Sequence, residues 1–174
     1  GVKMNLESFY KISYGMYIVT AKKGDNLNGQ MANSVFQVTA EPPQIAISIN
    51  LDNFTHQCIE ESQSFGISVL SQETPLRFIG NFGFKCGEDY DKLEGVDYKI
   101  GKTGVPIILD NSVAYIEAKV VDKKELGTHT LFIGEVIDAE ILTDDKVMTY
   151  EYYHDVKRGT LSEKASHYIE KEEE

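Results

Sequence analysis

The chain has 174 residues, of which 41% are hydrophobic and 26% are charged, so it is long enough to bury one core without disulfide support. Its 17 basic and 28 acidic residues give a net charge of −11, which argues against binding to nucleic acid or to an anionic membrane surface. Cys58 and Cys86 form no CxxC pair, and the histidines follow no ligand pattern, so no metal site is predicted. Since no apolar run approaches the ~18 residues of a membrane helix, we expect a soluble cytoplasmic protein.

The first part of the chain predicts one short helix followed by strands. Apolar residues at helical spacing follow Asn5, which is a suitable cap, and β-branched and aromatic residues dominate the next segments. Pro42 and Pro43 separate the last two strands, because neither proline can donate to a ladder. The expected elements are a helix over 5–12 and strands over 14–21, 31–39 and 44–50.

The rest of the chain adds short helices, a long loop and three more strands. One helix starts near Asn53 or Thr55, and another opens at Thr74-Pro75. The glycine-containing region 80–95 has little periodicity, which is typical of a functional loop. The further strands are expected over 65–70, 112–121 and 128–142. Six strands with short helices predict a mainly β domain, built as a closed or nearly closed antiparallel barrel.

Polar side chains are concentrated between Asn28 and Phe36, in one expected strand and the turn before it. They offer amide, thioether, hydroxyl and aromatic groups, which suit the carbonyl and N–H groups on the edge of an isoalloxazine ring. Met31 or Phe36 would suit the apolar face of such a ring. An ordinary half-buried strand would show the same pattern, so this alternative stays open.

Asn53, Thr55 and His56 stand at the expected start of a helix. A helix N-terminus offers unpaired N–H groups and a partial positive charge, so it stabilises a phosphate without a basic patch. The alternative is that Asn53 or Thr55 only caps the helix.

Two lysines and one histidine complete the candidates. Lys85 and Lys92 flank Cys86 in the long loop, where positive charge would help to hold an anionic ligand, although solvated lysines are the ordinary alternative. His129 stands at the entrance of an apolar strand. Its side chain can donate to a ligand carbonyl or pair with a backbone carbonyl at the strand end.

The order of these segments resembles the flavin reductase-like family. Residues 28–38, followed by a Pro-Pro turn, resemble its Asn-Gly pattern, and residues 47–56 resemble its second flavin-contacting strand and phosphate loop. Residues 127–136 are similar to its late Gly-x-His strand. Residues 82–92 look most like the flavoredoxin branch, which includes flavin domains fused to rubredoxin.

The resemblance implies a homodimer of six-stranded split β-barrels with FMN close to the subunit interface. Residues 1–158 would form the FMN-binding domain, and residues 159–174 would form a C-terminal extension with an acidic tail. Because the chain has no CxxC pairs, we expect no rubredoxin module in it. The electron acceptor would then be a separate molecule.

The resemblance also implies roles for individual residues. Those that would line the ring and the ribityl chain are Asn28, Gln30, Met31, Ala32, Asn33 and Ser34. Those that would hold the ribityl chain and the phosphate are Ser48, Asn50, Asn53 and Thr55. Positive charge would come from Lys85 or Lys92. His129 would lie near the ring edge without being obligatory for catalysis, and Tyr152 or Tyr153 would cover the ring.

The expected activity follows from the family. NADH or NADPH would transfer a hydride to the N5 atom of FMN, and electrons would pass to a free flavin or a small redox protein. A rival expectation is a non-enzymatic electron carrier whose FMN is reduced by a protein partner. A third is an oxidase of small amines or a heme-utilisation protein on the same barrel. The choice between them rests on family analogy.

Overall fold

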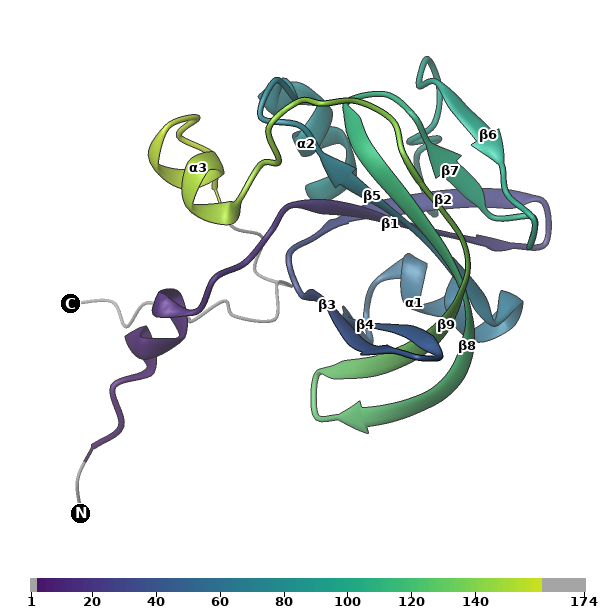
Figure 1. The fold of residues 1–174 in the computed structure, drawn as a ribbon, viewed down its shortest axis with the longest axis horizontal. Helices are drawn as coiled ribbons and strands as arrows, with labels where there is room; N and C mark the ends of the chain where they lie inside the picture. The colour runs from purple at the N-terminus through teal and green to yellow at the C-terminus, as the bar shows by residue number, and fades with distance from the viewer. Residues whose placement is uncertain (1–2, 161–174) are drawn as a thin grey trace.

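Apolar runs with β-branched and aromatic residues form the strands of the protein, as the computed structural model of residues 3–160 shows (Figure 1). The strands of the main sheet are β1 (Tyr17–Lys23), β2 (Asn26–Ala32), β3 (Val35–Ala40), β4 (Pro43–Asn50), β5 (Ser64–Leu70), β8 (Ser112–Leu126) and β9 (His129–Ile141). A separate hairpin pairs β6 (Tyr98–Ile100) with β7 (Pro106–Ile108). The helices are η1 (Leu6–Lys11), α1 (Phe54–Ser62), α2 (Leu76–Gly83) and α3 (Tyr150–Asp155).

The main sheet is antiparallel, with strand order β2-β1-β5-β8-β9-β4-β3. The expectation of a mainly β fold with short helices is therefore confirmed. The expected number of six strands is wrong, because the sheet has seven and is not closed between β2 and β3. The segment 31–39, expected as one strand, is interrupted at Asn33 and Ser34, where β2 ends and β3 begins.

Two apolar clusters cover opposite faces of β1. Val19 joins one cluster with Phe65 and Phe132, and its neighbour Ile18 joins the other with Phe82. Because successive side chains of a strand point to opposite faces, β1 is buried on both sides. Burying one large apolar side chain fully stabilises the fold by roughly 1.5–3 kcal/mol. This double burial holds β1, and the hairpin partner β2, in a fixed position.

The helix starts expected at Asn5 and near Asn53 are confirmed, whereas the helix expected to open at Thr74-Pro75 begins at Leu76, with Pro75 at its cap position. Asn5 caps η1, since its side chain accepts a hydrogen bond from the Glu7 N–H. Asn53 occupies the cap position of α1, and Gln63 ends this helix in the left-handed conformation with φ 56°. The short helix α3 was not among the elements expected from the sequence. In the described part of the chain, no helix has the length and apolar character needed to span a bilayer.

The structure describes the N-terminal helix but only the first two residues of the predicted C-terminal extension. The N-terminal helix η1 contains no buried residue and extends away from the sheet (Figure 1). The predicted C-terminal extension 159–174 lies outside the described residues, apart from its first two positions.

Candidate functional site

Two buried side-chain oxygens on β2 lack a hydrogen-bond partner among the described residues. They are Oδ1 of Asn28 and Oε1 of Gln30. Asn28 lies opposite Ala21 and Gln30 opposite Val19, so the two side chains share one face of the strand. Buried acceptors without partners are rare in folded proteins, and each needs an explanation. A ligand with N–H or O–H donors bound at this face of β2 would satisfy both oxygens.

The start of α1 lies beside the same face. The Asn28 amide donates a hydrogen bond of 2.7 Å to the Thr55 hydroxyl, and both residues are almost completely buried. Asn53 stands at the cap position, but its side chain makes no capping hydrogen bond, and the first turn carries no acidic residue. The N–H groups at this helix start are thus not engaged by the Asn53 side chain. A helix end of this kind favours an anion.

A glycine of the loop after α2 packs on the same side chain. Gly87 is buried, and a Cβ at this position would overlap the carboxamide oxygen of Asn28. The loop that the sequence marks as functional therefore covers β2 at Asn28.

Strands β4 and β9 bring a second group of predicted residues together. Asn50 is the register partner of His129, and the Ser48 N–H donates to the Ser34 carbonyl over 3.2 Å. The Asn50 side chain accepts a hydrogen bond of 2.9 Å from the Asp52 N–H. The His129 ring contacts the neighbouring hydroxyl of Thr128 over 2.8 Å. Asn50 ends β4, which leads into the segment before α1, and His129 begins β9 beside it.

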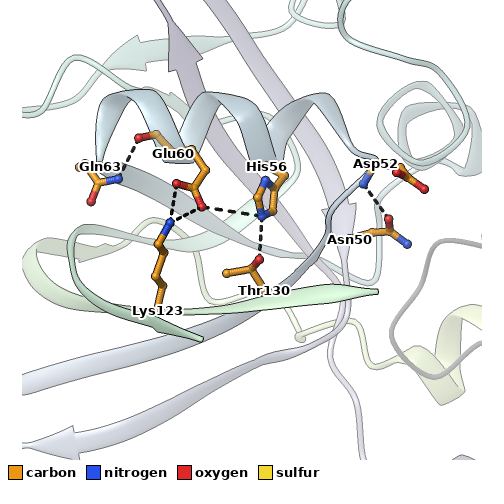
Figure 2. A network of polar contacts seen from close by, with 7 residues as sticks. All are labelled: Asn50, Asp52, His56, Glu60, Gln63, Lys123 and Thr130. Atoms are coloured by element: carbon orange, nitrogen blue, oxygen red, sulfur yellow. Dashed lines mark hydrogen bonds and ion pairs between the residues drawn. The ribbon is translucent and has the colours of Figure 1, made fainter. Parts of the chain in front are cut away.

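His56, which the sequence places at the helix start without giving it a role in binding, joins α1 to β9. Figure 2 shows its ring directed from α1 towards Thr130, with Nε2 2.8 Å from the Thr130 hydroxyl. Nε2 also lies 3.9 Å from Glu60, whose carboxylate pairs with Lys123 at 2.7 Å. The ring packs against Phe132 with centroids 5.3 Å apart. A sequence signal was present, since His56 falls in the first turn of the helix expected to bind phosphate.

Burial lowers the pKa of His56 below its ordinary value of 6.5. The nearby carboxylates of Glu60 and Glu125 oppose this shift, and the Lys123 ammonium adds to it. The unfolded chain therefore binds a proton at a higher pH than the folded chain. Stability that is complete above about pH 6.5 should decline as the pH falls towards the pKa of the folded state.

We expect this decline to depend on His56. Urea unfolding between pH 7.5 and 5 should show a smaller loss of stability for His56→Gln than for the wild type, because glutamine does not titrate. Carboxylates that titrate in the same range are common to both proteins, so the difference between the curves isolates the histidine. Parallel curves of stability against pH for the two proteins would contradict a lowered pKa of His56.

The two predicted lysines occupy different environments. Lys85 is exposed, with its ammonium 5.5 Å from the centre of the Tyr90 ring. Lys92 is only 4% exposed, and its ammonium donates to the carbonyls of Gly29 and Phe82 over 3.0 and 3.1 Å. Lys92 is therefore not a solvated surface lysine, which was the alternative left open by the sequence. It connects β2 at Gly29 to the end of α2 at Phe82.

The comparison with known families identifies the class of protein. The chain matches the flavin reductase like domain over residues 9–160. It belongs to the flavin reductase-like family. The resemblance inferred from the sequence is thereby confirmed.

Three relatives show how far the likeness extends. A ferric-chelate reductase (NAD(P)H) from Archaeoglobus fulgidus is 52% identical over 167 residues, which cover 96% of this chain and 99% of that protein. A high molecular weight rubredoxin from Moorella thermoacetica is 50% identical over 162 residues, covering 93% of this chain and 71% of that protein. Among solved structures, an NADH:FAD oxidoreductase from Streptomyces globisporus is 30% identical with a TM-score of 0.73, covering 82% of this chain and 84% of that one.

The geometry fits the cofactor that membership of the flavin reductase-like family implies. The unpartnered oxygens of Asn28 and Gln30 are acceptors of the type that an N–H group on a flavin ring needs. The start of α1 offers N–H donors next to Thr55, where the resemblance places a phosphate.

The tyrosines expected to cover a flavin lie on α3. Tyr153 is 2% exposed, belongs to the second apolar cluster and donates its hydroxyl to the Thr160 carbonyl over 2.7 Å. Its ring therefore packs inside the flavin reductase-like domain. Tyr152 is only partly buried, and its role stays a prediction.

The cysteines offer little for redox or metal chemistry. Both are free thiols, and burial raises the pKa of Cys58 to about 12, which makes its thiolate inaccessible at neutral pH. Cys86 is exposed in the loop. Within residues 3–160, no three His, Cys, Asp or Glu side chains are placed to hold a metal ion.

Proposed function

We propose that this member of the family is an FMN-dependent NAD(P)H reductase. The observation that carries the proposal is the likeness to a ferric-chelate reductase (NAD(P)H), which spans nearly the whole of both chains at 52% identity. Flavin chemistry at the proposed site agrees with the pair of unpartnered acceptors on β2.

Residues of β2, β4 and α1 would each bind a different part of the cofactor. Asn28 and Gln30 would accept hydrogen bonds from the ring edge, and Ser48 and Asn50 would bind the ribityl chain. The first turn of α1, with Thr55, would bind the phosphate, which favours FMN because its phosphate is terminal. The resemblance adds Met31, Ala32, Asn33, Ser34 and Asn53 to this set.

The flavin, when bound, accepts a hydride from a reduced nicotinamide and passes electrons on to an acceptor. The side chains of this protein position the cofactor and exclude water from it. His129 is half-buried at the start of β9, where its ring would hydrogen-bond the edge of the flavin without acting as an obligatory acid. No side-chain nucleophile is required.

The acceptor would be a ferric chelate, a free flavin or a separate small redox protein. The first follows from the name of the Archaeoglobus relative, and the last from the rubredoxin of the Moorella relative. One NAD(P)H supplies two electrons, so two ferric ions would be reduced for each nucleotide oxidised. A cytoplasmic location, where both nucleotides are available, is part of the proposal.

The absorption spectrum of the purified protein tests this function. With FMN added, the flavin bands should bleach under anaerobic conditions on addition of NADH or NADPH and return when a ferric chelate is supplied. FAD and riboflavin would be compared in the same titration. Flavin bands that neither nucleotide bleaches would instead favour the electron carrier, and a protein that takes up no flavin would refute the proposal.

We also propose that the protein is a homodimer joined in part by its N-terminal segment. Leu6 and Phe9, on a helix with no buried residue, and Ile12 at its C-terminal cap are between 44% and 54% exposed. Isolated helices this short are not stable in water, so η1 needs a surface to pack on. A second copy of the chain would provide it.

Replacing Phe9 with glutamate should raise the dissociation constant of this dimer at least tenfold, because it places a charge in an apolar contact. Sedimentation velocity over a concentration series measures the effect. Ile100→Glu is the matched control, since Ile100 is 56% exposed on β6 at the opposite end of the molecule (Figure 1). A wild-type protein that sediments as a monomer at all concentrations would refute the dimer.

A further inference from the structure

Two consecutive residues of α1 attach the start of this helix to different strands. Thr55 accepts a hydrogen bond from Asn28 on β2, and His56 contacts the Thr130 hydroxyl on β9. Strand β2 stands at one edge of the main sheet, whereas β9 lies next to β4 near the other edge. The first turn of the helix is therefore held from two sides.

The contact on β9 falls at the predicted binding residues. Thr130 follows His129 in the chain and is the register partner of Ile49, the neighbour of Asn50. Thr130 is fully buried and His56 is 8% exposed, so water does not compete freely for this hydrogen bond. Figure 2 shows that the His56 ring crosses from the helix to the strand, with Asn50 near the helix start. A shift of His56 would thus move the helix start relative to β4 and β9.

The other side-chain hydrogen bond of the helix start, from Asn28 to Thr55, leads to β2 and not to β9. Asn53 makes no side-chain capping hydrogen bond. The Glu60–Lys123 pair lies one turn further along the helix and is partly exposed. Exposed ion pairs contribute little to stability, typically about 0–1 kcal/mol.

We propose that His56 is a positioning residue, which through Thr130 holds the first turn of α1 in the orientation that binds the phosphate of FMN. The inference rests on the proposed function, because it requires that FMN binds at this helix. His56 need not touch the cofactor. We expect its effect to be largest at the phosphate end, since Asn28, the proposed ring-binding residue that contacts this helix, is bonded to Thr55 and not to His56.

The comparison of FMN with riboflavin, which lacks the phosphate, tests the role. Flavin fluorescence quenching would give both dissociation constants for the wild type, His56→Leu and Thr130→Val. We expect each variant to bind FMN about tenfold more weakly, the effect of losing one buried hydrogen bond, while riboflavin binding stays unchanged. His56→Gln, which keeps an N–H donor, should recover part of the FMN affinity.

Lys123→Met is the control from the same network and should leave the ratio of the two dissociation constants as in the wild type. Equal losses for FMN and riboflavin in His56→Leu and Thr130→Val would mean a general structural role and would overturn the inference, as would unchanged FMN binding. If the wild type binds neither flavin, the proposed function itself fails. If the wild type binds FMN and the variants keep its ratio of FMN to riboflavin dissociation constants, only the role of His56 is refuted.

Discussion

Replacing Lys92 with methionine is expected to lower the free energy of unfolding by roughly 2–5 kcal/mol. The ammonium of Lys92 donates to two carbonyls, those of Gly29 and Phe82, and is almost completely buried. Methionine fills a similar volume but donates no hydrogen bond, so both carbonyls would lose this donor inside the protein. Urea unfolding at pH 7.5, without flavin, measures the loss.

Lys85→Met is the matched control, because this lysine belongs to the same loop but is exposed. A surface change of this kind should alter stability by no more than about 0.5 kcal/mol. If Lys92 instead supplies charge to the phosphate, Lys92→Met would leave the flavin-free protein stable and weaken only FMN binding. Similar stabilities of the two variants without flavin would contradict the structural role that the contacts of Lys92 indicate.

Local patterns were sufficient for much of the fold. The cap at Asn5, the helix after Asn53 and the prolines Pro42 and Pro43 at the start of β4 lie within a few residues of the elements that they define. The break at Asn33 and Ser34 was missed because strand-forming residues stand on both sides of it, and only the pairing of β2 with β1 and of β3 with β4 separates the two strands.

In the candidate site, the contacts that the sequence did not predict join residues far apart in the chain. The hydrogen bond between Asn28 and Thr55 joins residues 27 positions apart, and the one between His56 and Thr130 joins residues 74 positions apart. The chain order, compared with the family, indicated both segments but not these contacts. The burial of Lys92 and of Tyr153 likewise depends on tertiary packing, since both residue types are more often found at the surface or half-buried.

Replacing Asn28 with leucine is expected to weaken FMN binding by about 10- to 100-fold and to change the stability of the flavin-free protein by no more than about 1 kcal/mol. Two effects oppose each other in the flavin-free state. The hydrogen bond to Thr55 is lost, but an oxygen that is buried without a partner is removed as well. In the complex, only a loss remains, because the acceptor for the flavin is gone.

Asn81→Leu is the control variant, which should lose a structural hydrogen bond without losing a contact to the flavin. The Asn81 amide donates to the Lys92 carbonyl over 2.9 Å, away from the unpartnered oxygens of β2, so its loss should reduce stability by about 1 kcal/mol without changing FMN affinity. Binding would be followed by flavin fluorescence, and stability by urea unfolding without FMN. If Asn28→Leu instead destabilises the flavin-free protein and binds FMN like the wild type, Asn28 serves the fold alone. Its carboxamide oxygen would then be stabilised by the approach of Gly87, and the ring edge would have to bind elsewhere on β2.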